Sequence, residues 1–81
     1  MQKHEIRIVG HALYTVRQEM WKRYCEPYYE HSGTRYEHEA MINRTIDTLI
    51  TRLGNDLAVG DAKFDRAEWF RACGVKDPSD V

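Results

Sequence analysis

Two long stretches of this chain repeat apolar residues every three or four positions, and Pro27 lies between them. The first stretch has the apolar residues Ile6, Val9, Leu13, Val16, Met20 and Tyr24. The second has Ile42, Ile46, Leu49, Ile50, Leu53 and Leu57. This spacing places each set on one face of an α-helix. Since a proline disfavours helical backbone at the residue before it, the first helix is expected to stop at Pro27.

The first predicted helix covers residues 6–26, and two features weaken its opening turns. Gly10 costs about 1 kcal/mol inside a helix relative to alanine, and Ile6 and Ile8 alternate with charged residues as in a short strand. Residues 1–10 therefore stay open between helix and strand. The second predicted helix covers residues 35–58, because Thr34 and Glu37 form the Thr-x-x-Glu pattern of a capping box. Gly54 is a candidate for an early end of this helix, and Gly60 is the later candidate stop.

A third, short helix is predicted over residues 66–73. Asp65 is a good N-cap, and Phe64 and Trp69 flank it at the spacing of a hydrophobic staple. Gly74 supplies a left-handed stop, and Val75 can fold back on the helix. Residues 76–81 are expected to form a loose tail. The chain is thus predicted to be one all-α domain, a small bundle of about three helices spanning residues 1–81.

Composition limits the classes of function. The 81 residues carry a formal net charge of −1, which disfavours both a basic nucleic-acid coat and an acidic DNA mimic. No apolar run reaches the length of a secretory signal or a membrane span, so a cytoplasmic protein that does not enter membranes is expected. The two cysteines, Cys25 and Cys73, are expected to be reduced thiols rather than a disulfide framework.

The run from Phe64 to Gly74 also resembles a known C-terminal pattern. It has Phe-Asp-Arg, two residues, an aromatic residue, an apolar residue, one more residue and then Ala-Cys-Gly. In this it is similar to small uncharacterised proteins of phages and actinobacteria, although Asp61-Ala62-Lys63 replaces their usual Asn-Pro. The resemblance covers about the last third of the chain. It implies a small accessory protein of the kind that phages encode to bind a host protein, acting in the host cytoplasm.

Metal binding and catalysis find little support in the residue pattern. The candidates for a metal or nucleophile site are Cys25, His31, His38, Glu37 and Glu39, with His4 and His11 as a further pair. They lack the close ligand pairs of a structural zinc site, and no base or orienting group is placed to activate a thiol. The known phosphate-loop, hydrolase and metalloprotease motifs are missing too. We therefore expect no metal, no cofactor and no enzymatic activity.

A second stripe of aromatic residues, Tyr14, Trp21 and Tyr28, runs along the first predicted helix about 90° from its apolar face. Either the third helix covers this stripe with Trp69, or part of it meets a partner, because tyrosine and tryptophan are favoured interface anchors. The sequence predicts a non-catalytic protein-binding module whose partner is a host protein or a second copy of itself. Its predicted contact residues are Tyr14, Arg17, Trp21, Tyr28 and Tyr29.

Two alternative functions stay open. One is a small DNA-binding regulator in which Arg66, Glu68 and Arg71 of the third helix face the groove, a use that the net charge disfavours. The other is a structural homodimer without another partner, since a small helical domain can complete its core by dimerising.

Overall fold

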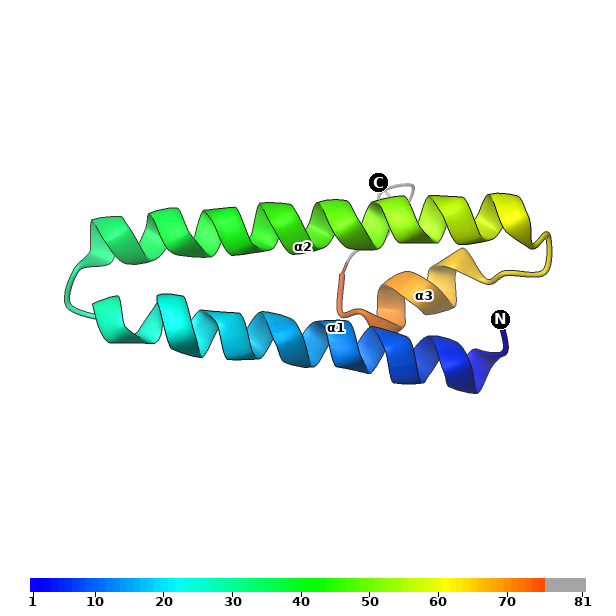
Figure 1. The fold of residues 1–81 in the computed structure, drawn as a ribbon, viewed down its shortest axis with the longest axis horizontal. Coiled ribbons are helices and arrows are strands. Elements are labelled where there is room, and N and C mark those ends of the chain that lie inside the picture. The colour runs from blue at the N-terminus through cyan, green and yellow to red at the C-terminus, as the bar shows by residue number, and fades with distance from the viewer. Residues whose placement is uncertain (76–81) are drawn as a thin grey trace.

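The computed structural model of the chain describes residues 1–75 and confirms the all-α fold class. Its elements are α1 (Lys3–Tyr24), a 3₁₀ turn (Glu26–Tyr28), α2 (Ser32–Gly60) and α3 (Arg66–Ala72). Figure 1 shows α1 and α2 as an antiparallel hairpin, with α3 packed against both near the N-terminus. The expected tail at residues 76–81 lies outside the described residues.

The beginning of α1 is helical, so the strand alternative for residues 1–10 is wrong. The helix starts at Lys3, three residues before the predicted start, because the Glu5 carboxylate accepts a hydrogen bond from the backbone N–H of Gln2 at 3.0 Å. This contact is one half of a capping box. Gly10 is tolerated because α3 approaches it closely: a Cβ built there would lie 2.7 Å from the Cβ of Ala72.

The predicted capping box at the start of α2 is wrong. The helix begins at Ser32, and the backbone N–H of Arg35 already donates to the carbonyl oxygen of His31 at 3.0 Å. Thr34 therefore lies inside the first turn rather than at its cap. At the other end, α2 continues through Gly54 and includes Gly60, the later of the two expected stops.

The local signals of α3 are all confirmed. The Asp65 carboxylate accepts a hydrogen bond from the backbone N–H of Glu68 at 3.1 Å, and the Phe64 and Trp69 rings lie 6.1 Å apart. Gly74 has a φ of 71°, and the N–H of Val75 donates to the carbonyl oxygen of Phe70 at 3.0 Å. This is a Schellman motif, which satisfies the last carbonyl groups of the helix.

The core is concentrated where α3 meets the hairpin. Trp69 is fully buried, and its indole N–H donates to the carbonyl oxygen of Ile50 at 2.9 Å. Its ring lies against Gly54, where a Cβ would come within 2.8 Å. The other buried apolar residues are Ile6, Cys25, Ile42, Ile46, Ile50, Phe64, Phe70 and Cys73.

The expected apolar face of α1 is only partly buried. Ile6 is buried and Leu13 and Met20 pack on the core, whereas Val9, Val16 and Tyr24 are more than a third exposed. The cause is the docking of α3 at Gly10, which turns that side of α1 inward. Val9 and Val16 lie about 100° and 120° from Gly10 around the helix, both in the same direction. They therefore face away from α3.

Candidate functional site at the hairpin end

The five residues predicted from the sequence to contact a partner lie in three separate places. Tyr14 lies beside the end of α3, where its ring would be 3.0 Å from a Cβ at Gly74. Arg17 and Trp21 line a groove between α1 and α2. Tyr28 and Tyr29 lie in the connection between the two long helices. The structure thus does not gather the five into one surface.

Arg17 and Trp21 have partners within the chain. The Arg17 guanidinium forms an ion pair with Asp47 of α2 and donates to the Asn43 side chain at 3.4 Å. Trp21 is half-buried and packs against the core. The sequence left two interpretations open for the aromatic stripe, and for Trp21 the structure supports packing within the chain. The other side of its groove is formed by α2, however, and not by α3.

The hairpin end carries a cluster of exposed tyrosines around one arginine. The Arg35 guanidinium lies 5.2 Å from the ring centre of Tyr29 and 5.1 Å from that of Tyr36. It also donates to the carbonyl oxygen of Tyr29 at 3.2 Å, which fixes its position. The two tyrosines are 69% and 62% exposed. We call Tyr29, Arg35 and Tyr36 the hairpin-end cluster.

A second contact secures the end of α1 beside this cluster. The last carbonyl groups of a helix lack partners within the helix, and the carbonyl oxygen of Tyr24 accepts a hydrogen bond from Nδ1 of His38 at 2.6 Å. The Tyr28 ring meets His38 edge-on, with ring centres 5.1 Å apart. These contacts join the end of α1 and the 3₁₀ turn to the first turns of α2, close in the sequence to the exposed tyrosines.

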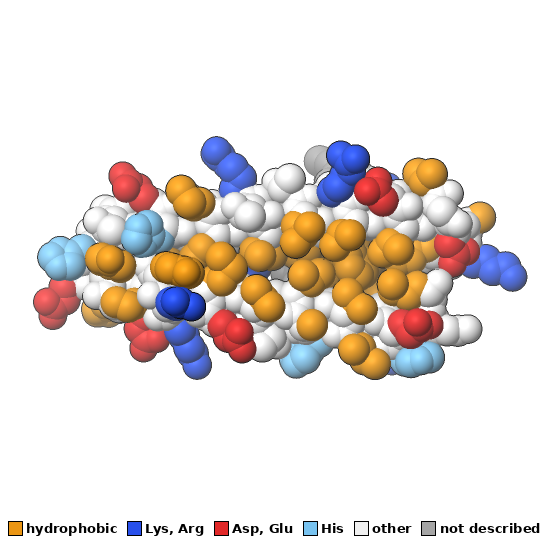
Figure 2. Space-filling model, in the orientation of Figure 1, with side chains coloured by type: hydrophobic (Ala, Val, Ile, Leu, Met, Phe, Trp, Pro, Cys, Tyr) orange, Lys and Arg blue, Asp and Glu red, His pale blue; other side chains and the backbone are white. Residues whose placement is uncertain are grey.

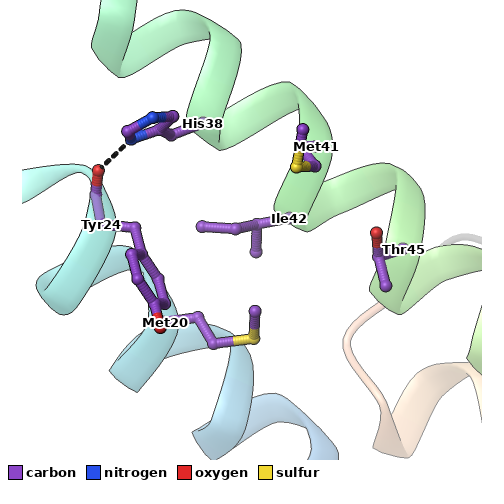
Figure 3. Close-up of a pocket in the computed structure, with 6 residues that line it drawn as sticks. All are labelled: Met20, Tyr24, His38, Met41, Ile42 and Thr45. Atoms are coloured by element: carbon purple, nitrogen blue, oxygen red, sulfur yellow. Dashed lines mark hydrogen bonds between the residues drawn. The ribbon is translucent and has the colours of Figure 1, made fainter.

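An apolar groove of about 340 Å³ opens next to this contact, between α1 and α2. In Figure 3, Tyr24 and Met20 lie on one side and the α2 residues on the other, with the His38 bond at the top of the groove. The lining residues are Met20, Tyr24, His38, Met41, Ile42 and Thr45. Methionine side chains adapt to differently shaped contacts, so this lining suits a protein or peptide side chain.

Two members of the hairpin-end cluster, Arg35 and Tyr36, were absent from the predicted contact residues. A signal for Tyr36 exists in the sequence, because Tyr29 and Tyr36 flank the turn residues that join the two helices. Arg35 has no such signal. Its contact with Tyr29 depends on the path of the connection, which the sequence spacing does not give.

The alternative nucleic-acid contact, Arg66 and Arg71, lies on α3. The Arg66 guanidinium lies over the Phe70 ring at 5.6 Å. Arg71 is exposed and pairs with Glu68 at 2.9 Å, and Arg7 of α1 pairs with the same carboxylate at 3.0 Å. Glu68, which the DNA-binding alternative places toward the groove, is buried between these two arginines.

Neither thiol is set up as a nucleophile. Cys25 and Cys73 are both free and fully buried. Burial raises the pKa of both thiols, that of Cys73 to about 11, which keeps them protonated at neutral pH. Across residues 1–75, no three histidine, cysteine or acidic side chains come together in a way that could hold a metal ion.

Comparison with protein-family models finds no match, and comparisons with curated proteins and with solved structures find no significant similarity. Within the described part of the chain, none of the helices has the length and apolar character needed to cross a bilayer.

Proposed function

We propose that this chain is a non-catalytic protein-binding module that contacts its partner with the hairpin-end cluster. The observation that carries the proposal is Arg35, held between two exposed tyrosine rings by contacts within the chain. Tyrosine and arginine are enriched among residues that dominate binding energy. A tyrosine buries a large area for the loss of few rotatable bonds, and pre-positioning reduces the entropy lost on binding.

The charges around the cluster indicate the chemistry of the partner. Three exposed carboxylates, Glu26, Glu30 and Glu37, lie within three residues of Tyr29 or Tyr36 in the sequence. They would repel a phosphate backbone and attract basic side chains. The proposed partner is therefore a protein surface with an apolar centre and a basic rim. The resemblance of residues 64–74 to phage and actinobacterial accessory proteins adds a setting to the proposal, in which the partner is a bacterial host protein.

The test is capture from a bacterial lysate by immobilised wild-type protein and by a Tyr29→Ala/Tyr36→Ala double variant. Both tyrosines are exposed, so the double variant is expected to keep its helical circular dichroism spectrum. We expect one stoichiometric protein on the wild type and at least a tenfold loss on the variant. Removing two anchors of about 1 to 2 kcal/mol each predicts a loss of this size or larger.

Tyr14→Ala is the matched control, because it removes a partly exposed tyrosine far from the hairpin end and is expected to keep the captured protein. Equal capture by all three proteins would contradict the assignment of the cluster. Recovery of nucleic acid alone, lost in an Arg66→Ala/Arg71→Ala variant, would instead support the DNA-binding alternative.

A further inference from the structure

One broad face of the hairpin is apolar and uncovered. Figure 2 shows hydrophobic side chains gathered in a band along the line between α1 and α2. The apolar groove of Met20 and Met41 belongs to this face. Val9 and Val16 extend it along α1, because residues four and eleven positions before Met20 share its side of the helix. We call this surface the open face.

The chain is more extended than a compact monomer of its mass. A compact monomer of this mass exposes about 5,100 Å² and has a radius of gyration of about 11.7 Å. This chain exposes 6007 Å² and has a radius of gyration of 14.3 Å. This is the shape of an elongated hairpin with one uncovered face.

The charges along the open side of α1 are arranged to pair with an inverted copy. Glu5 and Arg23 are eighteen residues apart, which is five helical turns, so they share one side of α1. That side is within about 40° of Val9 and Val16. If two α1 helices pack antiparallel with their midpoints at Tyr14, each Glu5 lies opposite the Arg23 of the other copy.

The apolar residues of α2 repeat this symmetry. Met41 and Val59, which are 68% and 89% exposed, are also eighteen residues apart on one side of their helix. Their midpoint is Ile50. The Arg17–Asp47 pair places Tyr14 and Ile50 at the same level along the antiparallel hairpin, each three residues away from the pair. A single twofold axis that runs across the hairpin from α1 to α2 therefore places Glu5 opposite Arg23 of the other copy. The same axis places Met41 opposite Val59 of the other copy.

We propose that the open face binds a second copy of this chain, antiparallel, to form a four-helix bundle. The reciprocal charges and the reciprocal apolar residues point to a second copy as the occupant. This inference goes beyond the proposed function and uses a different surface. The antiparallel arrangement places the two hairpin-end clusters at opposite ends of the bundle, which makes the module bivalent.

Sedimentation equilibrium of the full chain is the first test, with wild type expected at twice the monomer mass at micromolar concentration. Leu49→Glu and Val59→Glu place a charge in the open face at residues that are 43% and 89% exposed, so folding is expected to survive. Both are expected to weaken the dimer at least tenfold. Tyr29→Ala/Tyr36→Ala is the control: it stays dimeric but loses the captured protein.

A charge exchange tests the orientation. In Arg23→Glu, the new carboxylate of each copy lies opposite Glu5 of the other copy, so two like-charge pairs form in the dimer. This variant is expected to weaken the dimer about five- to tenfold. Arg23→Glu combined with Glu5→Lys is expected to recover most of that loss when compared with Glu5→Lys alone, because Glu5→Lys also removes the capping contact with Gln2. A monomeric wild type at 100 µM or so would overturn the proposal, as would a dimer that Leu49→Glu and Val59→Glu leave intact. Failure of the exchange to rescue would overturn the antiparallel arrangement. If wild type is monomeric and Leu49→Glu no longer captures the lysate protein, the open face binds a foreign partner instead.

Discussion

Replacing Gly54 by alanine tests whether α3 is seated on the hairpin as described. In the solvent-facing middle of a helix this change stabilises a protein by about 1 kcal/mol. Here the new Cβ would lie 2.8 Å from Cδ1 and 2.9 Å from Nε1 of Trp69. The ring is fully buried, and its Nε1–H is bonded to the Ile50 carbonyl oxygen, so it cannot move aside without losing that hydrogen bond.

The expected magnitude follows from these contacts. Overpacking a core costs about 1 to 3 kcal/mol, and disturbing a buried hydrogen bond costs about 1 to 2 kcal/mol more. After the gain in helix propensity, we expect Gly54→Ala to lower the free energy of unfolding by about 2 to 3 kcal/mol. In a domain of this size, that corresponds to a melting temperature lower by about 10 °C or more.

Alanine variants of two other glycines serve as controls. A Cβ at Gly10 would meet the backbone carbon of Ala72 at 2.8 Å, and backbone cannot rotate away, so Gly10→Ala is expected to cost at least as much as Gly54→Ala. Gly33, in the first turn of α2, has nothing within 4 Å of its Cβ position, so Gly33→Ala is expected to be neutral or stabilising by up to about 1 kcal/mol.

The assay is urea unfolding followed by far-ultraviolet circular dichroism for wild type and the three variants. One protein concentration is used throughout, because self-association would add to the apparent stability. A Gly54→Ala variant as stable as Gly33→Ala would show that the side chain of Trp69 does not lie against α2.

Three further predictions concern single residues. Asp65→Ala removes the cap of α3 and is expected to lower stability by about 1 kcal/mol, seen as a melting temperature a few degrees lower; an unchanged value would show that the cap contributes nothing. Because the Cys73 pKa is raised from 9.0 to about 11, the free energy of unfolding that the protein has below pH 9 is expected to fall as the pH rises toward 11. Urea titrations are expected to show a loss of at most about 3 kcal/mol for wild type and a smaller loss for Cys73→Ala. Trp21→Ala is expected to lower stability by about 1 to 2 kcal/mol for a half-buried side chain while leaving lysate capture intact, and lost capture by the folded variant would return Trp21 to the contact surface.

The sequence predicted α3 well because its signals are local. The cap, the staple and the left-handed glycine each act between residues within one or two helical turns. Asp65, Trp69 and Gly74 therefore have the same roles in any tertiary setting that keeps the helix. The stop near Pro27 was predicted for the same reason, because the restriction acts on the neighbouring backbone.

The parts that were wrong depend on contacts between distant segments. Gly54 suggested an early end for α2, whereas it allows Trp69 to approach. Gly10 weakened the predicted start of α1, whereas it allows Ala72 to approach. The choice of buried face on α1 depends on where α3 docks, and periodicity alone does not distinguish Val9 from Leu13. Thr34 failed as a cap because the helix begins earlier, at Ser32.

The candidate site was predictable only in part. An excess of tyrosines near the connection pointed to Tyr28 and Tyr29, since aromatic residues in a small polar turn have few ways to be buried. The joining of Tyr29, Arg35 and Tyr36 depends on the path of the 3₁₀ turn and the early start of α2. The ion pair of Arg17 could not be predicted either, because its partner Asp47 is thirty residues away in the sequence.

The proposed function requires that the hairpin end is the surface that binds a partner. The most direct measurement is an amide NMR spectrum of isotope-labelled protein, titrated with the protein captured from the lysate. We expect the largest chemical-shift changes on residues 28–36, and none in the Tyr29→Ala/Tyr36→Ala variant. Changes centred on Arg66 and Arg71, with residues 28–36 unaffected, would contradict it.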